Sequence, residues 1–147
     1  METIKVLDRL IATCIDAEKR YHRAAKDVGK AELGEFLGRQ SEIRKRAADE
    51  LQAERSRLGA AGGEAGTWAG LVDRRAMDFS VVMSMGDTGV ANWCREGAEA
   101  TAGEYENALR EVLAPDLRGV IQRQLGEVRS TIASLDEVLS VYGGPRS

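Results

Sequence analysis

Apolar residues recur every three to four positions along most of this chain, the spacing that gathers side chains on one face of an α-helix. The first stripe is the clearest and runs from residue 4 to residue 25. Its members are Ile4, Leu7, Ile11, Cys14, Ile15, Glu18, Tyr21, His22 and Ala25. Similar stripes follow further along the chain. Together they predict four long helices, over residues 2–28, 31–58, 88–113 and 115–142.

Glycine and proline residues mark where these helices begin and end. We expect Gly29 to end the first helix in the left-handed conformation that favours glycine. The sequence GAAGGEAG at residues 59–66 ends the second helix. Pro115 suits the first turn of the last helix, where its missing N–H is not needed. Thr67 is a candidate N-cap for a shorter helix over residues 68–85, whose mixed apolar pattern suits a connecting helix on the side of a bundle.

The lengths of the connections predict how the helices are arranged. Short links join the first helix to the second and the third to the fourth, so each pair forms an antiparallel hairpin. The segment over residues 59–88 is long enough to cross the full length of the bundle. We therefore expect an all-α, ferritin-like four-helix bundle, in which two hairpins are joined by a long crossover containing a short fifth helix. It forms a single domain over residues 1–142, followed by a flexible tail at residues 143–147.

The composition excludes several classes of function. The 147 residues are 43% hydrophobic and 31% charged, and the formal net charge of -3 argues against nucleic-acid binding. No apolar run approaches the ~18 residues of a membrane span, and charges come too early for a signal peptide. We therefore expect a cytoplasmic protein without a membrane or nucleic-acid partner. Cys14 and Cys94 are too few for a disulfide framework or a zinc site and are expected in the core.

Four segments, in order along the chain, resemble one bacterial protein family. They are LIATCIDAEKRYHRAAKDV at residues 10–28, RKRAADELQAERSRLG at residues 44–59, WCREGAEATAGEYENAL at residues 93–109 and APDLRGVIQRQLGEV at residues 114–128. The family that they resemble is domain-of-unknown-function family 2383, a group of uncharacterised ferritin-like four-helix-bundle proteins. The resemblance covers almost the whole chain and implies the fold that the hydrophobic pattern predicts.

The resemblance also directs attention to one level of the bundle. It implies a Cys-x-x-Gly-Glu pattern on the first helix and again on the third. On the first helix this chain keeps the glutamate as Glu18, whereas on the third helix Ala98 stands where the pattern has its glutamate. A histidine that the family often has on its last helix corresponds here to Ile132. Both departures fall in the layer of Glu18. They indicate a site that has been lost, or one never used for metal in this chain.

Counting ligands excludes a complete di-iron centre. Such a centre needs four carboxylates and two histidines, with Glu-x-x-His on each of two helices. This chain has one histidine, His22, and no Glu-x-x-His sequence. A reduced site remains as an alternative, because Glu18 and His22 lie four residues apart and could bind iron or manganese with carboxylates such as Glu104 and Glu127.

A structural interpretation of the same polar residues competes with the metal site. Glu18, Tyr21 and His22 could form a buried hydrogen-bonded cluster with Gln40 or Arg44 that fixes the register of the helices. A second polar level is expected nearer the other end of the bundle, where its long side chains could also reach solvent. It consists of Glu104, Gln124 and Glu127, with Glu104 expected opposite Gln124.

The sequence favours a non-catalytic structural or interaction role and leaves enzymatic activity open. It contains no motif for nucleophilic catalysis or phosphate binding. A stress-related role follows only by analogy with other bacterial bundles. The expected partners are a second copy of the chain, in a homodimer, and an unidentified protein. No cofactor is expected. The alternative is a metal-binding oxidative-stress protein that holds iron or manganese.

One group of large apolar residues bears on the choice of partner. It consists of Trp68, Met77, Phe79, Met83, Met85 and Trp93. These residues either seal the crossover helix onto the bundle, which we prefer, or form a patch for a partner helix.

Overall fold

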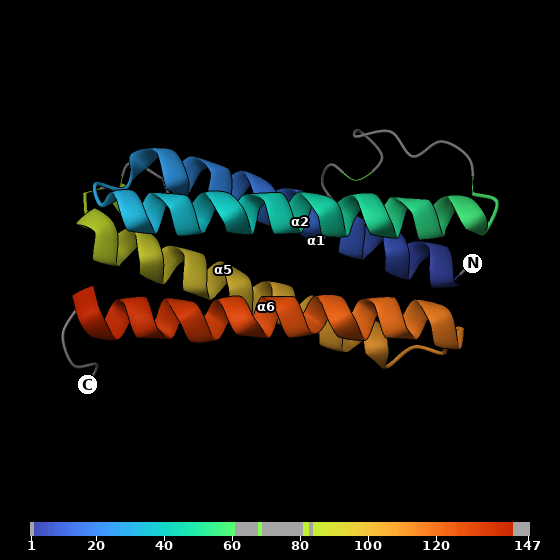
Figure 1. Ribbon diagram of the computed structural model, residues 1–147. Helices are drawn as coiled ribbons and strands as arrows, with labels where there is room; N and C mark the ends of the chain where they lie inside the picture. Colours follow the sequence, from blue (N-terminus) through green and yellow to red (C-terminus); the bar gives the residue numbers. More distant parts are fainter. Residues whose placement is uncertain (1, 61–67, 69–80, 83, 143–147) are drawn as a thin grey trace.

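The computed structural model describes residues 2–60, 68, 81–82 and 84–142, most of which belong to four long helices (Figure 1). They are α1 (Glu2–Asp27), α2 (Ala31–Arg57), α5 (Gly86–Leu109) and α6 (Pro115–Tyr142). No strand occurs among these residues. The prediction of an all-α protein with four long helices is therefore confirmed. The tail predicted at residues 143–147 and most of the fifth helix predicted over residues 68–85 lie outside the described residues.

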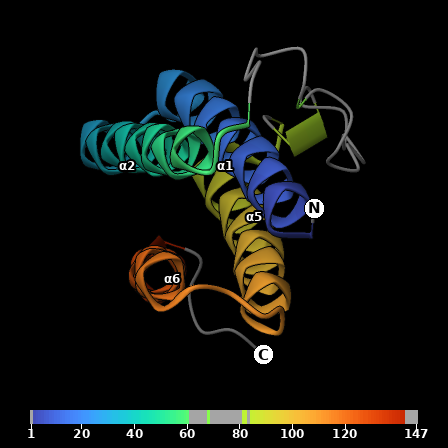
Figure 2. The ribbon, with the colours of Figure 1, turned by 90° about the vertical axis from the view of Figure 1, so that its right-hand side faces the viewer.

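The four helices are arranged as two antiparallel pairs. α1 packs against α2, and α5 packs against α6, as the short links predict. Contact between α1 and α5 joins the two hairpins, whereas α2 and α6 meet at only a few positions. Figure 2 shows α2 and α6 on the same side of the α1–α5 pair. Among the described helices, none has the length and apolar character that crossing a membrane requires.

The core consists of two apolar clusters, one toward each end of the bundle. The first cluster surrounds Tyr105 and includes Leu7, Ile11, Leu51, Ile121 and Val128. The second surrounds Tyr21 and includes Leu33, Leu37, Cys94, Leu135 and Leu139. On α2, α5 and α6, buried polar side chains lie between the positions that belong to the two clusters. They are Gln40, Ser41, Arg44, Thr101 and Thr131. The middle of the bundle is therefore polar even though it is closed to solvent.

The turn between α1 and α2 corrects the prediction for Gly29. Among the described residues only Gly59, with φ 78°, and Gly86, with φ 72°, have a positive φ, so Gly29 is not a left-handed stop. Asp87 at the start of α5 holds the turn instead. Its Oδ1 accepts a hydrogen bond from the backbone N–H of Gly29 at 2.8 Å, and its Oδ2 accepts one from Lys30 at 2.9 Å.

The ends of the other helices follow local sequence more closely. Gly59 ends α2 with the positive φ that glycine allows, and Pro115 opens α6 as predicted.

α5 ends at Leu109, four residues before the predicted position. Arg118 of α6 donates side-chain hydrogen bonds to the carbonyl oxygens of Leu109 (3.0 Å) and Glu111 (2.8 Å) just beyond this end.

Candidate functional site: a polar layer across the bundle

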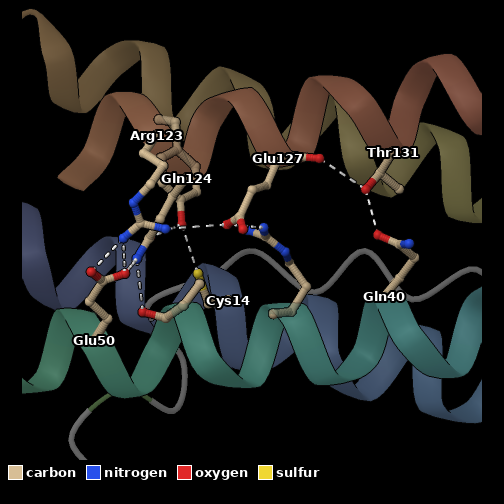
Figure 3. A network of polar contacts seen from close by, with 10 residues as sticks. Cys14, Gln40, Glu50, Arg123, Gln124, Glu127 and Thr131 are labelled. Atoms are coloured by element: carbon tan, nitrogen blue, oxygen red, sulfur yellow. Dashed lines mark hydrogen bonds and ion pairs between the residues drawn. The ribbon is translucent and has the colours of Figure 1, made fainter. Parts of the chain in front are cut away.

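A group of polar side chains, most of them buried, joins all four helices. We call this group the polar layer. It consists of Cys14 of α1, Gln40, Arg44 and Glu50 of α2, Tyr105 of α5, and Arg123, Gln124, Glu127 and Thr131 of α6. Figure 3 shows the members from α2 and α6 facing one another across the bundle, with Cys14 behind them.

Three contacts link all four helices through the polar layer. Tyr105 donates its phenolic proton to Oε1 of Gln124 at 2.6 Å, and Sγ of Cys14 lies 3.0 Å from the same phenolic oxygen. Because the phenol has only one proton, the thiol is the donor in the second contact. Gln124 in turn donates from Nε2 to Oε1 of Glu50 at 2.8 Å. Cys14, Tyr105, Gln124 and Glu50 therefore form one continuous hydrogen-bonded chain.

The acidic groups of this hydrogen-bonded chain, Cys14, Tyr105 and Glu50, keep their ordinary charge states. Burial raises the pKa of Tyr105, and it also raises the pKa of the Cys14 thiol, so both groups are neutral near pH 7. Burial alone would raise the pKa of Glu50 as well. Hydrogen bonds from Arg123 and Gln124 outweigh that effect and lower the pKa of Glu50, which stays ionised. Cys14, Tyr105 and Glu50 are thus not poised for proton transfer near neutral pH.

A second set of contacts crosses between α2 and α6 alone. Thr131 donates from Oγ1 to Oε1 of Gln40 at 2.6 Å. Nη2 of Arg44 lies 3.7 Å from Oε1 of Glu127, which is too long for a hydrogen bond. Arg123 pairs with Glu50. Figure 3 shows Gln40 and Glu50 of α2 on the side that faces Arg123, Glu127 and Thr131 of α6.

Two hollows open along the line between α2 and α6. The first has a volume of about 370 Å³ and is lined in part by Gln40 and Thr131. The second has a volume of about 500 Å³ and is lined in part by Glu50. Arg123 and Glu127 line both hollows, which therefore adjoin each other. We call the two hollows together the α2/α6 groove.

The structure does not bring Glu18 and His22 into this layer. The buried positions in this part of α1 are Ala17, Tyr21 and Ala24, so Glu18 is only partly buried and His22 is exposed. The predicted stripe through residues 18 and 22 is therefore rotated by about one position from the observed one. Among the described residues, the structure gives neither side chain a hydrogen bond or an ion pair.

The remaining members of the predicted site are divided between the polar layer and the surface. Gln40, Gln124 and Glu127 belong to the layer. Tyr21 lies in the second core cluster, where burial raises its pKa. Glu104 lies apart and accepts hydrogen bonds from Nε and Nη2 of Arg9 at 2.9 and 2.8 Å, and these bonds lower the pKa of Glu104. The residue opposite Gln124 is Tyr105 rather than the expected Glu104.

Sequence reasoning missed the roles of Tyr105, Glu50 and Arg123. A signal for Tyr105 was present, because a tyrosine on an inward stripe needs a partner for its hydroxyl. No comparable signal marked Glu50 or Arg123, since each is one of many charged residues on a helix flank. Within the described part of the chain, no three histidine, cysteine, aspartate or glutamate side chains are grouped so that they could hold a metal ion.

A comparison with known protein families identifies the family of this protein. The family described as "Domain of unknown function (DUF2383)" matches residues 2–111, which include α1, α2 and α5. The chain belongs to the DUF2383 family. The match confirms the family that the sequence segments resemble. It ends before α6, so this DUF2383 protein takes Arg123, Gln124, Glu127 and Thr131 of its polar layer from outside the matched region. A search of curated proteins gave no match.

Proposed function

We propose that this DUF2383 protein has a non-catalytic structural or interaction role and contains no complete di-iron centre. The observation that carries the proposal is the hydrogen-bonded chain through Cys14, Tyr105, Gln124 and Glu50. A reaction centre in a bundle of this kind is built from inward side chains at the level where the helices face one another. Here that level is occupied by groups that bond to one another.

The chemistry of the buried side chains supports the same proposal. Catalytic nucleophiles and general bases need a pKa close to the working pH. Burial instead raises the pKa of Cys94 to about 12 and raises that of Cys14. The Glu50 carboxylate is paired with Arg123 and bonded to Gln124. Cys14 and Cys94 are therefore kept neutral, and Glu50 is neutralised by a partner.

The arrangement of the helices supports a ferritin-like topology for the bundle. In Figure 1, α2 ends at one end of the bundle and α5 begins at the opposite end. The chain therefore leaves α2 and enters α5 at opposite ends of the bundle, as it does on either side of the crossover in a ferritin-like fold. An interaction role then falls to the outer surfaces of the bundle, and self-association is its simplest form.

The competing function is that of an iron- or manganese-binding protein which uses Glu18 and His22. An anaerobic titration with Fe²⁺ and Mn²⁺, followed by elemental analysis after desalting, separates the two. We expect no stoichiometric metal in the wild-type protein. Glu18→Ala serves as the test variant, and Glu42→Ala, which removes an exposed glutamate of α2, serves as the matched control. Stoichiometric metal that is lost in Glu18→Ala and kept in Glu42→Ala would overturn the proposal.

A further inference from the structure

Arg44 is a buried arginine whose charged end has too few partners. Only 3% of the residue is exposed, and its Nη1 and Nη2 atoms make no hydrogen bond within the described structure. A buried guanidinium is normally paired with an anion and hydrogen-bonded on several sides, because its five N–H groups lose water on burial. The neighbouring Cys14 and Tyr105 are neutral and already bonded to each other. They do not supply the missing negative charge.

The nearest carboxylate, Glu127, satisfies Arg44 poorly. Its Oε1 lies 3.7 Å from Nη2 of Arg44 and 3.9 Å from Nη1 of Arg123, so it is shared between two long ion pairs. The Glu127 side chain is 41% exposed. Since it is anchored weakly and borders solvent, Glu127 can move away from Arg44 without breaking a short hydrogen bond.

Arg44 is placed to reach the α2/α6 groove. On α2 it lies between Gln40, four residues before, and Ala47, three residues after, which places all three on one face of the helix. Gln40 lines the first hollow of the groove and Ala47 the second. The contact with Glu127, which lines both hollows, places the buried guanidinium of Arg44 behind the Glu127 side chain, although Arg44 itself lines neither hollow. The hollows, of about 370 and 500 Å³, exceed the share of one water molecule, ~30 Å³.

The charges around the groove favour an anion. Arg46 and Arg123 line it together with Glu50 and Glu127, and Arg44, which lines neither hollow, lies buried next to Glu127. Three arginines at or behind the groove therefore accompany two glutamates. Glu50 is already engaged by Arg123 and Gln124, so the carboxylate that the described structure places next to Arg44 is Glu127. The excess charge is positive.

We propose that the α2/α6 groove binds a small oxyanion, a carboxylate or a phosphate, through the guanidinium of Arg44, and that Glu127 occupies this place when the ligand is absent. A guanidinium binds such groups through two parallel N–H donors, and both Nη atoms of Arg44 have that capacity unused. Gln40 accepts from Thr131 through Oε1, which leaves its amide N–H groups as further donors at the groove. This inference goes beyond a non-catalytic role, which does not by itself imply a ligand.

Two variants test the proposal with opposite expected effects. Isothermal titration calorimetry at constant ionic strength uses inorganic phosphate in one arm and succinate, a dicarboxylate, in the other. We expect Glu127→Gln to bind the preferred probe at least tenfold more tightly than the wild type, because a competing carboxylate is removed. We expect Arg44→Met to bind it at least tenfold more weakly. Arg39→Met removes an exposed arginine of the same helix and leaves the affinity unchanged.

The outcomes separate an anion site from an arginine that is merely poorly paired. Binding of phosphate alone assigns a phosphorylated ligand, and binding of succinate alone assigns an organic acid. Equal affinity of Glu127→Gln and the wild type would overturn the proposal, as would absence of binding by both. If Arg44→Met does not fold, Arg44→Lys keeps the charge but loses the paired donors. Its affinity is then expected to fall severalfold, and an unchanged affinity would contradict the proposal.

Discussion

Glu104 is the clearest case of a single carboxylate that makes stability depend on pH. Its two oxygens accept hydrogen bonds from Arg9 across the α1–α5 contact, and these bonds lower its pKa below the ordinary value of 4.5. A carboxylate with a lowered pKa in the folded state contributes stability above the unfolded pKa and loses it as the pH falls through the folded pKa. The contribution of Glu104 is therefore complete near neutral pH, begins to be lost as the pH falls below about 4.5 and is gone below the folded pKa.

We accordingly expect Glu104→Gln to lose less stability on acidification than the wild type. The measurement is the midpoint of urea unfolding at about pH 7 and about pH 3, compared between the two proteins. Glu42→Gln, at an exposed position of α2, serves as the control and should follow the wild type. A Glu104→Gln variant with the same acid dependence as the wild type would show that the Arg9 contact does not stabilise the fold.

At the scale of elements, glycines inside the helices differ in what surrounds them. A Cβ at Gly119 of α6 would meet nothing within 4 Å. A Cβ at Gly97 of α5 would lie 2.6 Å from Nε of Arg20. Arg20 lies over the ring of Trp93, at 4.3 Å from its centroid, and donates to the backbone carbonyl of Trp93 at 3.2 Å. Gly97 therefore leaves space for a side chain of α1 to cross α5.

This difference predicts unequal outcomes for one type of substitution. Gly119→Ala should raise the free energy of unfolding by about 0.5–1 kcal/mol, the usual gain when alanine replaces glycine inside a helix. Gly97→Ala gains the same helix propensity but displaces Arg20 from Trp93, at a cost of about 0.5–1 kcal/mol. Chemical denaturation should therefore find Gly119→Ala more stable than the wild type and Gly97→Ala close to it. An equal gain in both variants would rule out a role for the Arg20 contact.

The helices themselves could be predicted because a stripe of apolar residues is a local property of the sequence. The all-α class, the four long helices and the two antiparallel pairs follow from that periodicity and from the short links. The details that were wrong depend on distant residues. Gly29 does not end α1 in a left-handed conformation because Asp87, from another helix, bonds to the backbone of the turn. The end of α5 is likewise bonded by Arg118 of α6.

The candidate site was less predictable, because it depends on the rotation of each helix about its own axis. The buried face of α1 is rotated by about one position from the predicted face, so His22 lies on the surface while Tyr21 is buried. The rotation of α5 about its axis likewise determines that Tyr105, and not Glu104, faces Gln124. Gln40, Gln124 and Glu127 were predicted because amide and carboxylate side chains stand out on an apolar stripe. Their partners could be assigned only once the helices were placed next to one another.

At the scale of the whole molecule, the polar layer compensates for an uneven set of helix contacts. α1 and α5 join the two hairpins by direct packing, but α2 and α6 touch at few positions. The phenolic oxygen of Tyr105 contacts Cys14 of α1 and Gln124 of α6, and Gln124 continues to Glu50 of α2. One hydroxyl group therefore stands at the junction of all four helices. The polar layer therefore acts as a structural link between the two hairpins.

The free energy of unfolding of Tyr105→Phe tests that claim most directly. The substitution keeps the ring in the first core cluster but leaves the buried Oε1 of Gln124 without its donor, at an expected cost of about 1–3 kcal/mol. Tyr142→Phe, which removes a hydroxyl from the end of α6, is the matched control and should leave stability unchanged. A loss of this size in Tyr105→Phe alone, with an unchanged helical circular dichroism spectrum, is the predicted result. Equal stability of Tyr105→Phe and the wild type would contradict the account.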